Sequence, residues 1–359
     1  MSDKAHAGTL YVVGGAALFG TIGTARLLGP SAPETSVASV RLAIAAVLLL
    51  ALASRHGLGS LGAAWRLGPV WVAGLAQAAF NVTFLSAVTQ AGVAVGTLVA
   101  IGCTPILTGL LSRHITRAWV GATAMAITGL VLLLSQGLGH GVSLAGLAWA
   151  LGASLCYATY ITASTALAPS ELKMETKLTA IFVIAAVCLS PALVLSPPTW
   201  LASGSGVAMV LYLAVATNVM AYSLFNRGLR TVAPGTAATL ALTEPLIAAV
   251  LGVVVLGERL STLSWLGAAV VLVALFVMIR VAGAPAPVRP PVPSGRKSAV
   301  ERAEMSPRAG GNVPSNGRKC AVERAEMSPR AGENVASSGS NSAVERAEMS
   351  PRAGENVRD

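Results

Sequence analysis

Apolar residues gather in ten runs of about 20 residues along the chain up to residue 281, separated by short polar stretches. At about 1.5 Å per residue, a helix of that length crosses the hydrocarbon core of a bilayer with its backbone hydrogen bonds satisfied internally. The pattern therefore predicts ten transmembrane helices, here called spans one to ten, at 9–28, 34–53, 68–88, 92–111, 117–135, 144–165, 178–196, 207–226, 235–256 and 262–281.

The composition agrees with an integral membrane protein. Hydrophobic residues make up 54% of the chain, charged residues make up 11%, and the mean hydropathy is +0.70, which is outside the range of soluble globular domains. The first run follows a short segment that contains Lys4, as the apolar core of a signal peptide would. Its length and its counterpart later in the chain favour a retained span instead.

Basic residues predict the orientation of the spans. If the N-terminus is cytoplasmic, most of the basic residues fall in cytoplasmic loops, and only Arg26 and Arg259 fall outside. The cytoplasmic residues would be Arg55, Arg66, Arg113, Arg117, Lys173, Lys177, Arg227, Arg230 and Arg280. An even number of spans then returns the C-terminus to the cytoplasm. The net charge of +10 does not indicate a nucleic-acid partner, because these residues form no continuous basic face with interleaved aromatics.

The spans divide into two halves of five, predicted as one repeat at 9–135 and a second at 144–281. "TPILTGLL" in span four corresponds to "EPLIAAVL" in span nine, and "AWVGA" in span five corresponds to "SWLGA" in span ten. Because five is odd, the second half crosses the membrane in the opposite sense. The charges agree, since the loops after spans two and four are basic and the loops after spans seven and nine are not.

Inverted repeats are typical of secondary transporters, whose substrate sites lie near the bilayer midplane and are often formed by broken helices. Pro105 and Pro245 occupy equivalent positions in spans four and nine, so both halves are expected to break a helix at similar depth.

The segment 283–359 has a different character. It is rich in proline at first and then repeats "AVERAEMSPRAG" three times with a 22-residue period. Each unit has too few apolar residues to build a core, so a disordered cytoplasmic tail is expected.

The two halves resemble the EamA-type domains of the bacterial drug/metabolite transporter superfamily, over roughly residues 9–281. The resemblance is carried by "EPLIAAVLGVVVLGE" from Glu244, by the "SWLGA" that follows it, and by "SVRLAIAAVLLL" from Ser39. It implies an all-α, ten-helix carrier of the bacterial inner membrane, with a central cavity between two four-helix groups and with spans five and ten at the periphery. It also implies the export of amino acids or other small metabolites.

Glu244 and Arg41 are the charged candidates for substrate binding. A charge at the centre of a membrane helix costs roughly 2.5–3.5 kcal/mol on insertion scales, so Glu244 needs a hydrated cavity, a proton or a partner. It either braces the kink at Pro245 or contacts a substrate amine or a proton. Arg41 lies seven residues into span two, and it either extends to the outer surface, pairs with Glu244 or holds an anionic substrate group.

Neutral polar residues complete the candidate substrate-binding set. Gln77 and Asn81 are four apart in span three, and Asn218 and Tyr222 repeat that spacing in span eight. They would line an aqueous pocket or, on the other interpretation, bind neighbouring helices together. Thr104 in span four matches Glu244 in span nine but cannot titrate.

These features predict a secondary transporter that exports a small polar metabolite, such as an amino acid or an amine, by alternating access. The chain has no P-loop motif, no cofactor motif and no metal-ligand spacing, and its histidines (His6, His56, His114 and His140) all lie outside the spans, so an enzyme is not expected. A non-transporting scaffold or sensor on the same fold is the alternative. The expected partners are the small-molecule substrate and the bilayer, and no nucleic acid; coupling to a proton or ion and the oligomeric state stay open.

Overall fold

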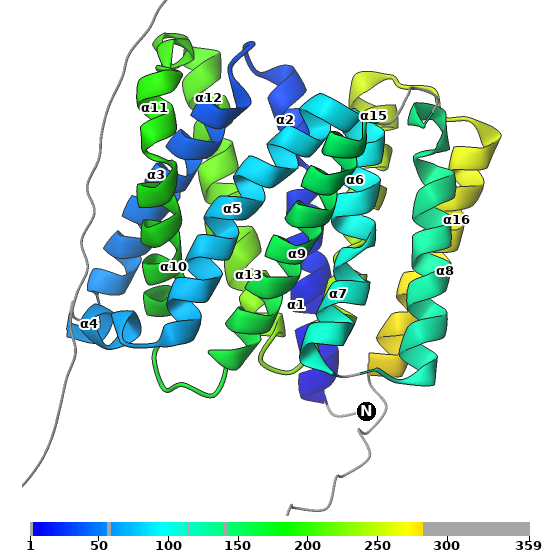
Figure 1. Ribbon diagram of the computed structural model, residues 1–359, viewed down its shortest axis with the longest axis horizontal. Helices are drawn as coiled ribbons and strands as arrows, with labels where there is room; N and C mark the ends of the chain where they lie inside the picture. The colour runs from blue at the N-terminus through cyan, green and yellow to red at the C-terminus, as the bar shows by residue number, and fades with distance from the viewer. Residues whose placement is uncertain (1–2, 56–58, 114, 139–142, 283–359) are drawn as a thin grey trace, which may run out of the picture. The chain divides into compact units, whose positions relative to one another are not determined.

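The computed structural model describes residues 3–55, 59–113, 115–138 and 143–282, and every regular element in these ranges is helical (Figure 1). The predicted tail at 283–359 lies outside the described residues. The spans, in chain order, are α1 (Asp3–Phe19) with α2 (Ile22–Leu28); α3 (Glu34–Ser54); α5 (Gly68–Ala91); α6 (Val93–Gly102) with α7 (Thr104–Ser112); α8 (Arg117–Leu133); α9 (Leu144–Ala166); α10 (Met174–Leu189) with α11 (Pro191–Leu195); α12 (Gly204–Tyr212), the π-helix η3 (Leu213–Met220) and α13 (Ala221–Gly228); α14 (Pro234–Leu240) with α15 (Thr243–Leu256); and α16 (Thr262–Ala282). The connecting elements are α4 (Gly59–Trp65), η1 (Ser135–Gly137) and η2 (Thr199–Ala202).

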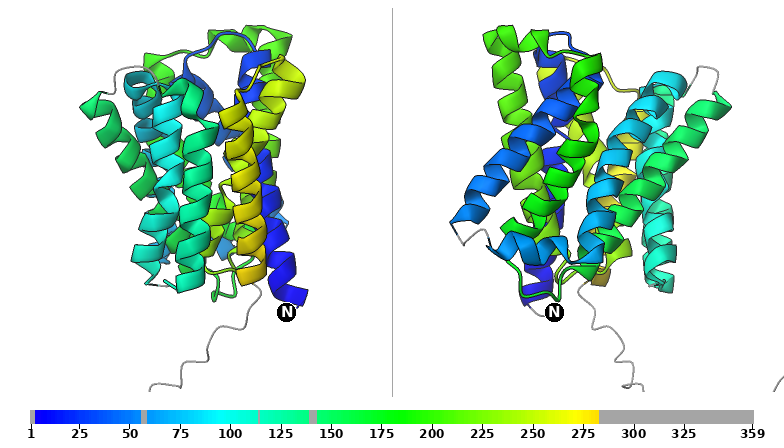
Figure 2. Two further views of the ribbon diagram at one scale, coloured as in Figure 1. Left: turned by 90° about the vertical axis from the view of Figure 1, so that its right-hand side faces the viewer. Right: turned by 60° about the vertical axis from the view of Figure 1, so that its left-hand side comes forward.

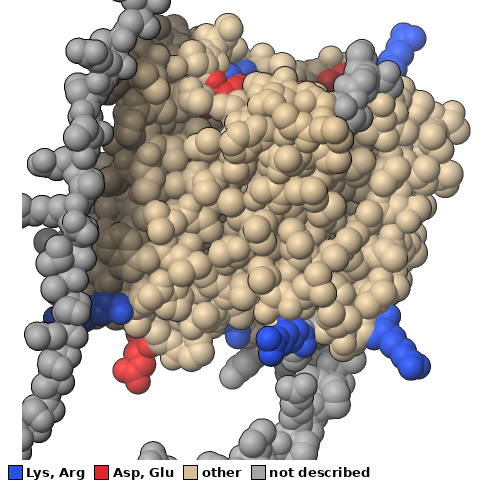
Figure 3. Space-filling model, viewed as in Figure 1, with Lys and Arg blue, Asp and Glu red and all other residues tan. Residues whose placement is uncertain are grey.

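The lengths and the surface both suit a membrane. Within the described residues, nine of the spans are long and apolar enough to cross a bilayer, and the tenth, α8, is apolar but has only 17 residues. Large apolar side chains such as Leu111, Val187 and Phe276 point outward. In Figure 3 the visible face is almost free of charge between two edges where Lys, Arg, Asp and Glu gather. Lipid would therefore cover the apolar band.

Eight of the spans pack side by side in a closed ring. Following the ring, α5 packs on α9, α9 on α6 and α7, α7 on α14, α15 on α1, α1 on α13, η3 on α3, α3 on α10, and α10 on α5. Spans five and ten (α8 and α16) pack on each other outside the ring, in the peripheral position that the resemblance implies (Figure 2). The polar residues of the ring helices can therefore face a common interior.

Corresponding helices of the two halves run in opposite directions. In Figure 1, α1 begins at the side of the molecule marked N and runs away from it, whereas its counterpart α9 runs towards that side. We call this side the N-terminal side and the opposite one the far side. The same reversal relates α3 to α10 and α5 to the α12–α13 span. The inverted arrangement follows from the odd number of crossings in each half.

Spans four and nine are both broken next to their prolines. In span four, α6 ends at Gly102 and α7 begins at Thr104, and Pro105 lies in the first turn of α7. In span nine, α14 ends before α15 begins at Thr243, and Pro245 lies in the first turn of α15. A proline at the start of a helix costs little, because the N–H that it lacks has no partner within the helix there. The two prolines thus begin new helices inside the membrane-spanning region.

The peripheral pair is held by close approach of small residues. Gly129 of α8 faces α16 so closely that a Cβ placed on it would lie 2.7 Å from the backbone nitrogen of Val271. Gly267 of α16 faces the backbone of α8 in the same way. Such contacts let two helices pack through dispersion forces where the hydrophobic effect gives no help.

Candidate functional site

The break in span nine explains why a glutamate and a proline stand side by side in an apolar run. Glu244 lies in the first turn of α15, immediately before Pro245. A helix N-terminus carries roughly half a positive elementary charge, which stabilises a nearby carboxylate. The carbonyl of Ala241, which cannot receive an N–H from Pro245, accepts the N–H of Glu244 at 2.9 Å. The break therefore satisfies the backbone and provides a favourable position for the acid.

A chain of hydrogen bonds joins spans two, three and eight. The Arg41 guanidinium donates from Nη2 to Oδ1 of Asn81 at 2.9 Å. The side-chain amide of Asn81 donates to the backbone carbonyl oxygen of Gln77 at 2.8 Å. The side chain of Gln77 in turn donates from Nε2 to the Tyr222 hydroxyl at 2.7 Å. We call these four residues the polar network. It joins α5 to α13, which are counterparts in the two halves.

Arg41 and Glu244 lie close enough to act on each other electrostatically. They do not form a direct ion pair, because the pairs within 4.0 Å in the described part of the chain are Arg26 with Glu34 and Arg227 with Glu175. Arg41 instead turns towards Asn81 of the neighbouring helix. A guanidinium group and a carboxyl group are therefore held apart on spans two and nine, beside the polar network.

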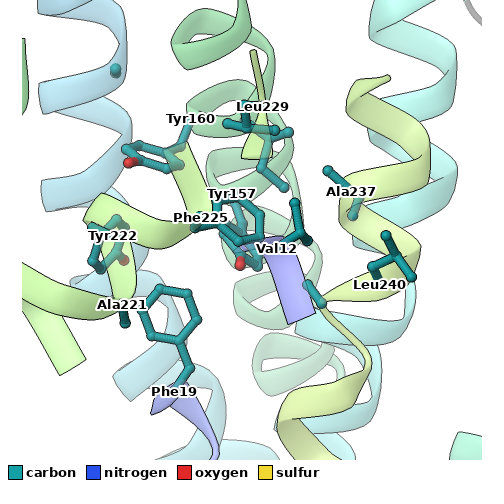
Figure 4. Close-up of a cluster of buried hydrophobic side chains, with 14 of the residues drawn as sticks. Val12, Phe19, Tyr157, Tyr160, Ala221, Tyr222, Phe225, Leu229, Ala237 and Leu240 are labelled. Carbon is teal, nitrogen blue, oxygen red and sulfur yellow. The ribbon is translucent and has the colours of Figure 1, made fainter. Parts of the chain in front are cut away.

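Aromatic rings pack around Tyr222. Its ring centroid lies 4.8 Å from that of Phe19, 5.1 Å from that of Phe182 and 5.4 Å from that of Tyr160, each in an edge-on arrangement. These rings come from spans one, seven and six, so four spans of the ring meet at Tyr222. Phe19, Tyr160 and Tyr222 are labelled in Figure 4. Asn226, one turn further along α13, donates to the Tyr160 hydroxyl at 2.7 Å. Together these side chains fill the interior of the ring at this depth.

Exposure changes along the network. Arg41 and Asn81 are partly exposed, as is Glu244 outside the network, whereas Gln77 is 3% exposed and Tyr222 is 7% exposed. Arg41 lies seven residues from the start of α3 on the far side of the bundle. The charged end of the network is therefore the accessible end, and the aromatic residues around Tyr222 close the interior beneath it.

Two of the predicted substrate-binding residues do not join the network. Thr104 is buried, and its hydroxyl donates to the carbonyl of Ala100 at 2.6 Å and lies 3.2 Å from Oγ of Ser154. Asn218 is 2% exposed, and its Nδ2 has no hydrogen-bond partner. The sequence prediction assumed α-helical spacing between Asn218 and Tyr222. Asn218 lies in the π-helix η3, whose i→i+5 bonding ends at Met220, so the regular α-helical turn that relates Gln77 to Asn81 does not apply between Asn218 and Tyr222.

Two cavities lie away from the polar network. One, of about 840 Å³, is on the N-terminal side and is lined by the start of α1, the loop between α9 and α10, and the end of α13. The other, of about 440 Å³, is on the far side between α2, α12 and α15. Neither is lined by the predicted substrate-binding residues. In the described ranges, no cluster of His, Cys, Asp or Glu side chains could hold a metal ion.

Asn226 and Tyr160 extend the polar groups towards the N-terminal side, and neither was among the residues predicted from the sequence. A signal for Asn226 was present, because it continues the four-residue spacing from Tyr222 and leads on to Arg230. Tyr160 carried no such signal, because an aromatic residue in an apolar span is ordinarily part of the packing.

Comparison with known proteins fits this architecture. Residues 144–280 match the model of the EamA-like transporter family. Over 282 residues the chain is 35% identical to the uncharacterized transporter YwfM of Bacillus subtilis (strain 168), covering 77% of this chain and 94% of that protein. The chain belongs to the EamA-like transporter family. It is thus a multi-pass membrane protein of a transporter family.

Other EamA-like relatives are more distant. The threonine/homoserine exporter RhtA of Escherichia coli (strain K12) is 28% identical over 277 residues, covering 74% of this chain and 88% of that protein. The uncharacterized inner membrane transporter YedA of the same strain is 27% identical over 284 residues, covering 75% and 88%. One solved crystal structure has the same fold, with a TM-score of 0.67 at 22% identity, covering 77% of this chain and 97% of that chain.

Proposed function

We propose that this EamA-like transporter exports a small zwitterionic solute, an amino acid such as threonine, across the bacterial inner membrane by alternating access. The observation that carries the proposal is the placement of the Arg41 guanidinium and the Glu244 carboxyl group beside the polar network, without an ion pair between them. A zwitterion presents the complementary pair, a carboxylate for the guanidinium and an ammonium for the glutamate. The likeness to an exporter of threonine and homoserine supports the same solute class.

Each charged residue has a specific role in this proposal. Arg41 would hold the carboxylate, since a guanidinium offers two parallel donors to two carboxylate oxygens. Glu244 would accept from the ammonium group and remain stabilised by the N-terminus of α15. The neutral groups of Asn81 and Gln77 would bond a polar side chain of the solute. Tyr222 would lie at the closed end of the network.

The orientation is part of the proposal. The N-terminal side is rich in Lys and Arg, which favours a cytoplasmic position for it. The accessible end of the network would then face the outside of the inner membrane. Transport requires the aromatic contacts around Tyr222 to open towards the cytoplasm while the far side closes. Inverted halves support this alternation between open sides, because each half would adopt the arrangement that the other half has now.

Flux through purified protein tests the proposal. Proteoliposomes loaded with radiolabelled L-threonine should release it faster than protein-free liposomes. Arg41→Gln and Glu244→Gln should each lower kcat/KM by roughly 10- to 150-fold, because each removes a charge-assisted bond worth about 1.5–3 kcal/mol. Arg259→Gln is the matched control, because Arg259 is exposed beyond α15 and should leave the flux unchanged.

The outcomes separate the two functions that the sequence left open. Movement of L-threonine, or of another amino acid in a panel of the common twenty, supports a carrier of zwitterions. Flux that is unaffected by both charge-removing variants would refute the assigned roles. The absence of flux for the entire panel would instead favour a scaffold or sensor on the EamA-like fold.

A further inference from the structure

The cavity on the N-terminal side has more positive than negative charge. Its volume is about 840 Å³, which is ample for a small solute. Its charged lining consists of four cations and two carboxylates, namely Lys173, Lys177, Arg227, Arg230, Glu171 and Glu175. The cavity thus has the charge balance of an anion-binding site.

The carboxylates of the lining leave this excess in place. An ion pair in the lining joins Nη2 of Arg227 to Oε1 of Glu175 at 3.8 Å, and both side chains are substantially exposed, so the pair is weak. Arg230 acts electrostatically on Lys177, so two like charges are close to each other. Repulsion between like charges favours a bound anion that lies near both.

Lys177 is held rigidly in this lining. The residue is 4% exposed, and its Nζ donates to the carbonyl oxygens of Leu167 at 2.7 Å and Ser170 at 3.0 Å. These carbonyls follow the end of α9 and fix the ammonium group in position. Because they carry no formal charge, they leave the positive charge of Lys177 unneutralised. A positioned, buried cation costs little further ordering when an anion binds to it.

Polar groups connect this cavity to the polar network. Arg230 lies four residues after Asn226, whose amide donates to Tyr160 and also to the carbonyl of Tyr222 at 2.9 Å. Tyr222 in turn accepts from Gln77. Polar side chains therefore follow α13 from the cavity to mid-depth, and Asn226, Tyr160, Tyr222 and Gln77 are hydrogen-bonded to one another.

We propose that this cavity is a loading site, in which Lys177 and Arg230 bind the carboxylate of the solute before the ring opens towards the N-terminal side. The inference rests on the proposed export of a zwitterion, since an exported solute arrives from the cytoplasm. Glu171 and Glu175 line the same cavity and would accept from its ammonium group. The solute then passes along α13 when the bonds of Asn226 and Tyr222 break.

Thiol labelling tests the site without requiring transport. The cysteines (Cys103, Cys156, Cys188 and Cys320) are replaced by alanine, and Ser170→Cys introduces a single thiol in the cavity wall. An anionic methanethiosulfonate applied from the N-terminal side should react about tenfold faster than a cationic one, at the low end of the range for charge-focused encounter. Arg230→Gln should bring the two rates close to parity, whereas the matched control Arg117→Gln, which changes a charge outside the cavity, should not.

L-threonine supplies the second measurement. It should slow the labelling of the introduced thiol, and in inside-out vesicles Arg230→Gln should raise the KM for its uptake with little change in kcat. Equal labelling rates for the two reagents, or an anionic preference that survives Arg230→Gln, would overturn the anion site. A protein that transports L-threonine but is not protected by it would overturn the loading role.

Failure of the proposed function has a different signature. In that case the wild-type protein moves no amino acid of the panel, while the labelling preference is still measured on the same preparation. A preference that disappears in the Arg230→Gln variant would then establish the anion site and exclude only its role in amino-acid export.

Discussion

The hydrogen bond between Gln77 and Tyr222 links counterpart helices of the two halves, and its contribution to stability can be measured. Its length is 2.7 Å, and both side chains are buried. Tyr222→Phe removes the acceptor and leaves a buried amide donor without a partner, which costs about 1–3 kcal/mol. The double variant, which also carries Gln77→Leu, has no such donor. Its loss in free energy of unfolding should therefore be smaller than the sum of the losses in the two single variants.

The expected coupling is about 0.6–1.7 kcal/mol, from the mean to the maximum for hydrogen bonds between membrane helices, or roughly a 3- to 20-fold change in the unfolding equilibrium. The assay is reversible unfolding in mixed micelles, followed by circular dichroism, for the wild type, the two single variants and the double variant.

A matched control uses the same chemical change at an exposed position. The Tyr212 hydroxyl donates to Oγ1 of Thr21 at 2.9 Å, and this bond is exposed. Tyr212→Phe should therefore cost well under about 1 kcal/mol, because solvent or lipid headgroups can replace the partner. Additive effects of the Gln77 and Tyr222 variants, within about 0.3 kcal/mol, would show that the bond does not couple the two halves.

Two further predictions concern close contacts between helices. Gly129→Val should destabilise the protein by about 1–3 kcal/mol, because the added carbons overlap the backbone of α16, whereas Gly121→Val on the same helix should have little effect, since a Cβ there meets nothing within 4 Å. A melting temperature that falls equally in both would contradict the predicted packing. Gly20→Val should reduce transport more than stability, because a Cβ there lies 2.5 Å from the carbonyl oxygen of Glu244 and would displace the break in span nine. Gly23→Val is its control, with nothing within 4 Å of the added Cβ, and equal flux in the two variants would count against this reasoning.

Much of the fold was predictable because it depends on local properties of the chain. All ten apolar runs contain helix, but the helices extend beyond the apolar stretches: α10 begins at Met174, four residues before the predicted start of span seven. The backbone hydrogen bonds of a helix continue into neighbouring polar residues, so hydropathy alone does not predict where the helix ends. The positions of the two breaks were also local, since Pro105 and Pro245 each lack the N–H that a continuous helix requires.

The candidate site was predictable only in part. The sequence identified the polar residues of the spans, including Arg41 and Glu244, but it assigned no partners to them. It placed Thr104 beside them by analogy between the halves, whereas the structure bonds that hydroxyl within its own span and beside Ser154. It related Asn218 to Tyr222 by α-helical spacing, and the π-helix η3, which contains Asn218, was not visible in that spacing.

The sequence by itself therefore determined which segments span the membrane, where two of them break, and that the halves run in opposite directions. Each of these follows from the hydropathy, the backbone chemistry or the parity of a continuous stretch of chain. Only the tertiary structure decided the order of helices in the ring and the rotation of each about its axis. Rotation is set by contacts between residues far apart in the chain, such as Gly20 against Glu244 and Gln77 with Tyr222. Because those contacts choose which polar groups meet, they also choose which of the candidates form one network.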